Sequence, residues 1–433
     1  MDINPDKRRL LYVCDLNLSN GGAQKVTYNT LGCLASRYEI FIYSNFRPSD
    51  ESINLAKELG IKIFLDFDFN LNKLADKIKE FKIEYILLQY ENPKWVSSLC
   101  HLKRKLGVKT IILMYELPYI HTPINKFIHS WLVLTIINKG INFLSYARKY
   151  LKNYSTTSLE YVKVEEFSRH RSTIPKWSKF LQIITKSVIE LRDTFKGIQQ
   201  SDALIAMGPA TKFYLKKYLK IRSSILEVDH IAAVDLPDGF KLDKKSYTYD
   251  ICFMAARLEK GKGIFDLLKV LSKAQKNFDR KINLAIIGRF TLNEVENDFH
   301  NLLDRYQLRS NVSLLGFIPE TEKVEVLNTS RIFVYPSRQD VFSISLAEAL
   351  AYGCPAVVFE LPFTEQYVSE SVYRAPYKKL TIMSRDVVDL LNLSYDKPEV
   401  FKDLSGQSSI FIQNNFNWTK TCQELSNVLN LIL

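Results

Sequence analysis

The chain has 433 residues, of which 46% are hydrophobic and 24% are charged, as in an ordinary globular protein. This length exceeds what one core normally supports, so we expect two domains. The net charge is +12, but residues 121–200 alone hold 13 Lys and Arg against 5 Asp and Glu. Because the excess is concentrated in one segment and no helix-turn-helix, zinc-finger or RNP motif is present, we predict no nucleic-acid partner.

The first half of the chain alternates short apolar runs with helical patterns. We expect strands at Leu10–Cys14, Glu39–Tyr43, Ile61–Phe64, Tyr85–Gln89, Thr110–Met114 and Ala203–Met207. Helical patterns lie between them, for example at Gln24–Ser36 and Leu71–Phe81. This alternation predicts a parallel sheet covered by helices, with ligands bound at the carboxyl ends of the strands.

Three places in this half are candidates for function. Gly21 and Gly22 open the first helix, where glycine allows either close approach of the backbone to a ligand or an ordinary tight turn. Glu116 follows the fifth strand and should face a cleft, and His121 nearby is either structural or catalytic. The Asp-x-Asp sequence at 66–68 is also the pattern of a metal site, but we interpret it as a solvated loop and predict no metal.

Residues 121–200 form a predicted basic helical insert that also carries Trp131, Trp177 and many other aromatic residues. Basic and aromatic helices of this kind are typical of a lipid headgroup region. The segment therefore favours an anionic partner, either a lipid-linked saccharide diphosphate or an acidic membrane surface. The alternative is a helical elaboration of the first domain with a solvated basic face.

The second half repeats the alternating pattern. We expect strands at Ile251–Met254, Asn283–Ile287, Val312–Leu315, Ile332–Tyr335 and Ala356–Phe359. The sequence thus predicts an α/β protein with two Rossmann-like, doubly wound domains facing each other across a cleft. We place the domains at 1–240 and 241–415, followed by a C-terminal helix at 416–433. The boundary falls in a polar stretch at 235–246 that contains Pro and Gly.

Two cations follow the first strand of the second domain. Arg257 lies directly after the buried run, and Lys262 precedes Gly263 at the start of an apolar helix. Fixed cations at a strand end can stabilise the negative charge that grows on a departing phosphate, without a metal. Guanidinium gives forked hydrogen bonds to phosphate and ammonium a point charge. Lys260 is an alternative to Lys262 as the second cation. The whole motif could also be an ordinary solvated strand–helix turn without a binding role.

An acid pair follows the strand that ends at Tyr335. Asp340 is at the tip of a turn, a predicted helix runs from about Ser343 to Tyr352, and Glu348 lies on the helix body. The backbone N–H groups at the start of such a helix favour an anion. A carboxylate one to two turns along suits the hydroxyls of a bound sugar. This layout fits a nucleotide diphosphate sugar.

The two motifs resemble the retaining glycosyltransferases of family 4, which have the GT-B fold. The residues that match the family pattern are Arg257, Lys262, Pro336, Ser337, Asp340, Phe342, Glu348, Ala349, Gly353 and Pro355. The chain departs from the pattern where Asp340 replaces Glu, and where Val341 and Ser343 replace two glycines.

The resemblance implies a role for each matching position. Arg257 and Lys262 would stabilise the leaving diphosphate, Glu348 would hold the ribose, and Asp340 would contact the transferred sugar. The substrate-binding set would be Gly21, Gly22, Phe317, Ile318, Phe342, Ser343, Ile344 and Ser345. Backbone groups of Phe317 and Ile318 would contact the nucleotide base, and the alternative for their two side chains is packing in the core. Glu116 matches an acid that the family places near the reacting sugar.

The implied reaction is a retaining, metal-independent transfer of a hexose-type sugar. The donor would be a UDP- or GDP-linked sugar, the acceptor a glycan or lipid-linked saccharide, and no cofactor would be needed. Two alternatives remain open. One is a non-catalytic GT-B-fold subunit of a glycosylation complex, and the other is a different GT-B enzyme such as a sugar-nucleotide epimerase.

The six cysteines are scattered and form no Cys-x-x-Cys pair. We expect them to be small buried hydrophobes in a reducing compartment rather than a disulfide framework. The N-terminal residues lack the apolar region of a signal peptide, and no apolar run reaches the length of a membrane span. We therefore expect a cytoplasmic protein, which is either free or, if the basic insert binds an acidic surface, peripheral on the cytoplasmic face of the membrane.

Overall fold

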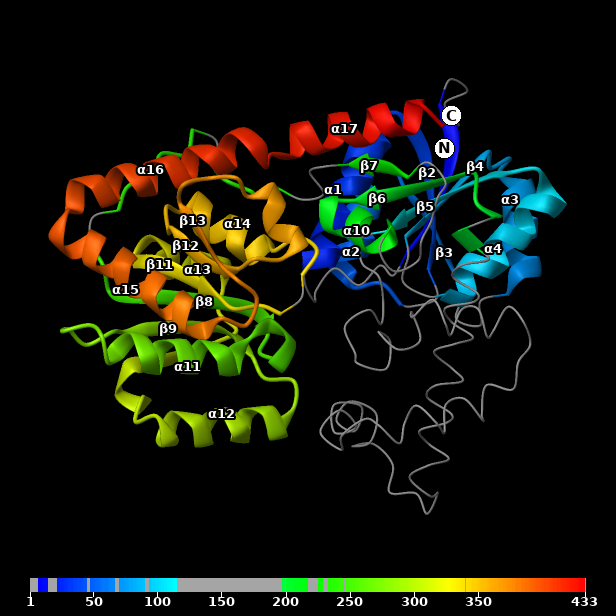
Figure 1. Cartoon of the computed structure of the whole chain (residues 1–433). Helices are drawn as coiled ribbons and strands as arrows, with labels where there is room; N and C mark the ends of the chain where they lie inside the picture. The colour runs from blue at the N-terminus through cyan, green and yellow to red at the C-terminus, as the bar shows by residue number, and fades with distance from the viewer. Residues whose placement is uncertain are drawn as a thin grey trace, which may run out of the picture.

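The protein contains two parallel β-sheets, each covered by helices (Figure 1). The computed structural model describes residues 7–14, 22–44, 47–66, 70–89, 93–114, 197–198, 200–216, 225–228, 233–237, 239–244, 246–338 and 340–432. The predicted α/β architecture with two doubly wound sheets is confirmed. The predicted basic insert lies almost entirely outside the described residues.

The first sheet has seven strands in the order β3-β2-β1-β4-β5-β6-β7. They are β1 (Arg8–Val13), β2 (Tyr38–Ser44), β3 (Lys62–Leu65), β4 (Tyr85–Gln89), β5 (Lys109–Met114), β6 (Ala203–Met207) and β7 (Leu226–Val228). Every pairing between them is parallel. The central strands are continuous apolar runs because helices cover both faces of the sheet.

Helices connect these strands. They are α1 (Gly22–Ala35), α2 (Asp50–Glu58), α3 (Leu71–Glu80), α4 (Pro93–Leu106) and the short α10 (Pro209–Tyr214). Helix α3 shows why such a helix begins where it does. The side chain of Asn70 accepts hydrogen bonds from the amides of Asn72 and Lys73, and Leu74, Ala75 and Ile78 lie on its buried face.

The second sheet has six strands in the order β10-β9-β8-β11-β12-β13. They are β8 (Tyr249–Arg257), β9 (Leu284–Arg289), β10 (Val312–Gly316), β11 (Ser330–Tyr335), β12 (Ala356–Phe359) and β13 (Val372–Ala375). Two edge strands, β7 and β13, were not predicted from the sequence. Both are short, and β13 includes Arg374, so neither gives the apolar run by which a buried strand is recognised.

The helices of this half cover both faces of the second sheet (Figure 1). They are η5 (Lys260–Lys262), α11 (Ile264–Gln275), α12 (Asn293–Arg305), η6 (Arg309–Asn311), α13 (Glu320–Asn328), α14 (Ile344–Ala351), η7 (Pro362–Gln366), α15 (Leu380–Asp396), α16 (Pro398–Asn415) and α17 (Trp418–Asn430). No helix among the described residues is long and apolar enough to cross a membrane.

Helix α17 returns from the second sheet to the first, where it contacts α1 and β7 (Figure 1). At its start, the indole Nε1 of Trp418 donates a hydrogen bond to Asp235 at 2.6 Å. Further along, Cys422 forms a disulfide with Cys33 of α1, with their Cα atoms 5.2 Å apart. The C-terminal helix is therefore fastened to the first domain both by packing and covalently.

The prediction that the cysteines form no disulfide is wrong for this pair. The two residues are separated by 389 positions, so their spacing gives no sign of the pairing. It arises only because α17 crosses back onto α1. Cys14, Cys252 and Cys354 agree with the prediction, because they are buried and form no disulfide within the described residues.

We expect removal of the disulfide by Cys422→Ser to lower the free energy of unfolding by about 2–4 kcal/mol, because the cross-link constrains a very long loop of the unfolded chain. Urea denaturation with and without dithiothreitol measures the effect. The reductant should lower the midpoint of the wild type and leave that of the Cys33→Ser/Cys422→Ser variant unchanged. Equal midpoints for the wild type under both conditions would show that the bond does not form.

Candidate functional site

The strand order of the second sheet identifies where a ligand should bind. The order reverses between β8 and β11, and in open parallel sheets such a reversal creates a crevice at the carboxyl ends of the two strands. Arg257 ends β8 and Tyr335 ends β11. The cation motif and the acid motif predicted from the sequence therefore meet at this crevice.

A close backbone contact joins the two motifs. Gly263 has φ of +83°, and a Cβ on it would lie 1.9 Å from the carbonyl oxygen of Pro336. Beside this contact, the amide of Arg338 donates a hydrogen bond to the carbonyl of Gly261 at 2.9 Å. Only glycine permits both the left-handed conformation and this approach. The η5 turn is thus held directly against the segment that leads to Asp340.

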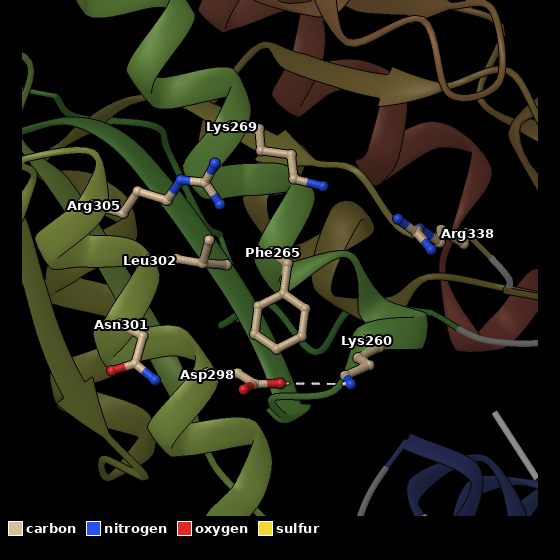
Figure 2. A pocket seen from close by; sticks show the side chains of 8 residues that line it. All are labelled: Lys260, Phe265, Lys269, Asp298, Asn301, Leu302, Arg305 and Arg338. Carbon is tan, nitrogen blue, oxygen red and sulfur yellow. Dashed lines mark ion pairs between the residues drawn. The ribbon is translucent and has the colours of Figure 1, made fainter. Parts of the chain in front are cut away.

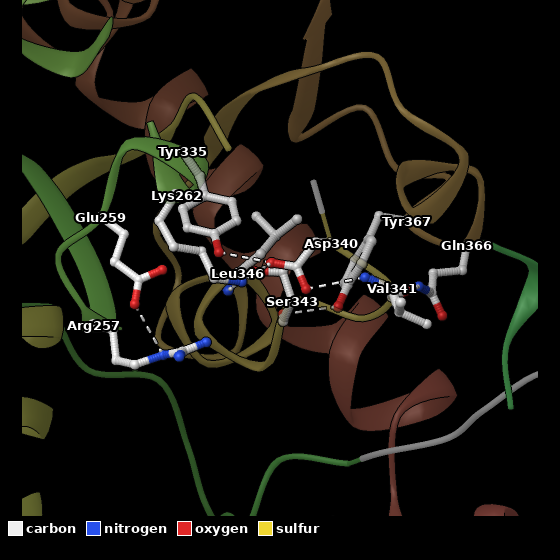
Figure 3. A network of polar contacts seen from close by, with 10 residues as sticks. All are labelled: Arg257, Glu259, Lys262, Tyr335, Asp340, Val341, Ser343, Leu346, Gln366 and Tyr367. Atoms are coloured by element: carbon white, nitrogen blue, oxygen red, sulfur yellow. Dashed lines mark hydrogen bonds and ion pairs between the residues drawn. The ribbon is translucent and has the colours of Figure 1, made fainter. Parts of the chain in front are cut away.

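Asp340 is the centre of a polar network (Figure 3). Its Oδ2 accepts a hydrogen bond from the Lys262 ammonium at 2.9 Å and another from the Tyr335 hydroxyl at 2.7 Å. Its Oδ1 accepts one from the amide of Val341 at 3.0 Å. Burial and the Asp340 carboxylate raise the pKa of Tyr335 to about 12, so the hydroxyl remains protonated and donates at neutral pH.

The amino-terminal end of α14 lies beside this network. Ser343 caps the helix, with its hydroxyl accepting a hydrogen bond from the amide of Leu346 at 3.3 Å. Its carbonyl accepts a hydrogen bond from the buried Tyr367 hydroxyl at 3.0 Å. Ile344 and Ser345 are half-buried in the first turn. The positive end of the helix dipole here favours an anion.

Phe342, a predicted substrate-binding residue, is 8% exposed. Its ring packs against Tyr367 and Phe416, with centroid distances of 5.8 and 5.5 Å. The Phe342 side chain therefore packs inside the protein and supports the turn before α14. Only the backbone of Phe342 would be able to contact a substrate.

Glu348 is buried on α14 and forms an ion pair with Lys323 of α13 at 2.9 Å. Lys323 also pairs with Glu320 at 2.8 Å. Burial disfavours the charge on Lys323, but the carboxylates of Glu348 and Glu320 outweigh it and raise the lysine pKa. The carboxylate of Glu348 is thus paired with a cation that fixes it in place.

Among the described residues of the predicted set, Arg257 and Phe317 are the exposed ones. Arg257 pairs with Glu259 at 3.3 Å, and Figure 3 shows its guanidinium extending toward the side of the network where Lys262 and Ser343 lie. Phe317 is 71% exposed, and the guanidinium of Arg289 lies 5.8 Å from its ring centroid. Ile318 beside it is half-buried. An exposed aromatic ring with a nearby cation offers a surface on which a base can stack.

Several predicted residues of the first domain cannot be placed. Gly21 and Glu116 lie outside the described residues, as does His121, and Gly22 is the first residue of α1. The prediction that the Asp-x-Asp sequence is a solvated loop is wrong for Asp66. This residue is buried and accepts hydrogen bonds from the Tyr43 hydroxyl and the Asn70 amide, both at 2.6 Å. Asp66 is a structural acceptor because it orients the start of α3.

Residues 240–390 match the family model described as "Glycosyl transferases group 1". The matched residues contain both motifs. No curated protein matches the chain significantly.

Among solved structures, a glycosyltransferase from Rickettsia africae has a TM-score of 0.67 at 12% identity, covering 99% of each chain. The Anabaena protein HepE in complex with UDP and glucose has a TM-score of 0.62 at 11% identity, covering 98% of this chain and 100% of that one. A TarM mutant from S. aureus, crystallised with Fondaparinux, alpha-GlcNAc-glycerol and UDP, has a TM-score of 0.63 at 11% identity with the same coverage.

The chain has the GT-B fold. The candidate site contains two polar residues that sequence reasoning missed, Tyr335 and Lys323. Tyr335 could have been suspected, because a tyrosine that ends a buried strand points its hydroxyl into the crevice. No pattern singles out Lys323, whose partner Glu348 lies 25 residues away on another helix.

The contact between Gly263 and Pro336 gives a direct test of how the site is held together. Gly263→Ala should lower the free energy of unfolding by about 2 kcal/mol or more, because the new Cβ meets backbone and the φ angle is strained. Gly406→Ala is the matched control. Nothing lies within 4 Å of its added Cβ and it is inside α16, so it should be neutral or stabilising. Urea denaturation compares the two, and equal effects would contradict the close contact.

Proposed function

We propose that this protein is a retaining, metal-independent glycosyltransferase that moves a hexose-type sugar from a nucleotide diphosphate sugar. The proposal depends most on one observation. Lys262 and Asp340, 78 residues apart in sequence, lie 2.9 Å apart beside the amino-terminal end of α14, at the crevice of the second sheet. A cation, an acid and a helix dipole together match the charges of a sugar diphosphate. The group 1 model over residues 240–390 supports the same assignment.

The donor phosphates would lie between the two cations and the start of α14. Arg257 is exposed and extends toward this space, and Lys262 borders it. As the glycosidic bond breaks, these cations would stabilise the charge on the leaving diphosphate. Amides of the first turn, at Ser343, Ile344 and Ser345, would add hydrogen bonds. Fixed cations at this place would stabilise the leaving diphosphate, as a bound metal ion does in other enzymes. This is the basis for proposing a metal-free reaction.

The two acids would hold the two sugars of the donor. Glu348 is held in place by its ion pair with Lys323, and its carboxylate oxygens would accept hydrogen bonds from ribose hydroxyls. Asp340 would contact the transferred sugar through the carboxylate that now binds Lys262 and Tyr335. The leaving phosphate itself would take the proton from the acceptor hydroxyl, so no separate side-chain base is required. Retention of configuration follows from attack on the face that the phosphate leaves.

Phe317 and Ile318 would bind the nucleotide base. HepE and TarM were crystallised with UDP, which makes UDP the first candidate and GDP the second. We propose a glycan or lipid-linked saccharide as acceptor, because residues 121–200 are basic and aromatic. The same segment would place the protein on the cytoplasmic face of the membrane.

A thermal-shift experiment with UDP, GDP, ADP and their common sugars, all with EDTA, tests the donor site. A ligand at 100 times its Kd stabilises the native state by about 2.7 kcal/mol, so one nucleotide should raise Tm by several degrees. A rise in EDTA supports a metal-free site and names the base. If none of the nucleotides raises Tm, the result would favour the alternative that the protein is a non-catalytic GT-B-fold subunit.

Charge-removing variants test the assigned roles. Lys262→Met and Glu348→Gln should each lower turnover by about two orders of magnitude, because each removes one transition-state or substrate contact while keeping the shape of the side chain. Lys273→Met, an exposed lysine on α11, is the control and should keep full activity. Activity is measured as nucleotide release from the donor that gives the thermal shift. Wild-type turnover in both site variants would refute the assignment.

A further inference from the structure

A second cationic cavity lies next to the candidate donor site, between α11, α12 and the segment before Asp340 (Figure 2). Its volume is about 440 Å³, within the range of sites that hold small molecules. Four of the residues that line it are cations, namely Lys260, Lys269, Arg305 and Arg338. Neither the group 1 model nor the proposed reaction assigns a role to this cavity.

Three of the cations come from different elements and face the same space. In Figure 2 the guanidinium of Arg305 extends from α12 toward α11, and Lys269 of α11 and Arg338 point toward each other. The buried Asp266 holds Arg338 in orientation. The Oδ2 of Asp266 accepts a hydrogen bond from the Nε of Arg338 at 2.7 Å and lies 2.7 Å from the Nη2 of the same arginine. The ammonium of Lys269 lies 3.6 Å from the other oxygen of Asp266. A carboxylate below the surface thus fixes two cations of the group.

The cavity remains positive after its acids are counted. Lys260 pairs with Asp298 at 3.6 Å, and Asp266 is shared by Lys269 and Arg338. Among the described residues, four cations and two carboxylates leave a net charge of +2. The ring of Phe265 and the side chain of Leu302 provide apolar wall between the charges. Like charges gathered in one cavity repel each other, and an anion of matching charge removes that repulsion.

We propose that this cavity binds a phosphate ester and is an anion site separate from the donor site. A phosphate carries up to two negative charges and accepts several hydrogen bonds, which suits guanidinium and ammonium groups that converge from different sides. The volume exceeds what phosphate alone fills. The apolar wall formed by Phe265 and Leu302 would accommodate the organic part of the ester.

The two sites share one turn but use opposite sides of it. In η5, Lys262 binds Asp340 at the donor side, whereas Lys260 binds Asp298 at the cavity. Arg338 lines the cavity two residues before Asp340, and its amide is bonded to Gly261. The proposal does not rest on the glycosyltransferase function, because the proposed donor site uses no residue that lines the cavity. Lys260, the alternative second cation in the sequence, pairs with Asp298 of the cavity.

Inorganic pyrophosphate is the probe, measured by isothermal titration calorimetry at low ionic strength with and without excess UDP. The test variant is Lys269→Gln/Arg305→Gln, which leaves the Arg338–Asp266 pair intact. We expect it to weaken pyrophosphate binding at least tenfold, because it removes two phosphate-facing charges. The matched control is Lys273→Gln/Lys276→Gln, an equal loss of charge at exposed positions on and just after α11. It should leave the affinity within about twofold, because charges outside the cavity contribute only screened interactions.

Three results would overturn the proposal: equal weakening in test and control variants, no weakening in the test variant, or complete competition between pyrophosphate and UDP on the wild type. The two proposals fail separately. If the wild type binds no nucleotide but its pyrophosphate binding depends on Lys269 and Arg305, the donor assignment fails and the cavity assignment stands.

Two sources carry this phosphate chemistry, a soluble sugar phosphate and a lipid headgroup. Cosedimentation with phosphatidylcholine vesicles that contain phosphatidic acid separates them. Loss of vesicle binding in the Lys269→Gln/Arg305→Gln variant, with binding kept in the control, assigns a lipid phosphate. Unchanged vesicle binding together with weakened pyrophosphate binding assigns a soluble ligand.

Discussion

The contact between Gly263 and the carbonyl of Pro336 is the constraint on which the site depends. This contact holds the turn after β8 directly against the segment after β11, with no room for a side chain between the two backbones. Lys262 and Asp340 meet as a result, although 78 residues separate them. The same contact places Lys260 and Arg338 at the neighbouring cavity. One backbone approach therefore organises two groups of charges that face opposite sides of a single turn.

The start of α14 is supported from the C-terminal end of the chain. Phe342, Tyr367 and Phe416 form an aromatic cluster, in which the rings of Tyr367 and Phe416 stack at 5.0 Å. Phe416 leads into α17, and its carbonyl accepts a hydrogen bond from the amide of Val234 at 3.2 Å. Helix α17 is in turn bonded to α1 through Cys422. The position of the candidate anion site is thus linked mechanically to the first domain.

The sequence was sufficient for what depends on local pattern. Buried strands such as β4 and β12 are apolar runs of the expected length, and the strand–turn–helix around Asp340 has a recognisable spacing. It was insufficient where a contact depends on how distant elements pack. The pairing of Cys33 with Cys422 and that of Lys323 with Glu348 have no local signature. Asp66 was misjudged for the same reason, since its burial depends on Tyr43 of the neighbouring strand.

The departures from the family pattern have a physical account in this backbone. The capping residue Ser343 has φ of −92°, and among the described residues the non-glycine positive φ angles belong to Lys82, Gln307 and Lys378. A side chain at Val341 or Ser343 is therefore tolerated without strain.

Asp340 has a shorter side chain than the Glu of the family pattern, but neighbouring hydrogen-bond donors hold its carboxylate in place. Tyr335 and the amide of Val341 hold the carboxylate whether or not Lys262 remains bound to it. An entering diphosphate would exchange one anionic partner of Lys262 for another, and the carboxylate would keep two hydrogen bonds. Because neither charge is left without a partner, the desolvation penalty that normally opposes separation of a buried ion pair is reduced. In the proposed function, the network would therefore admit an anion at the end of α14 and leave Asp340 available to a sugar hydroxyl.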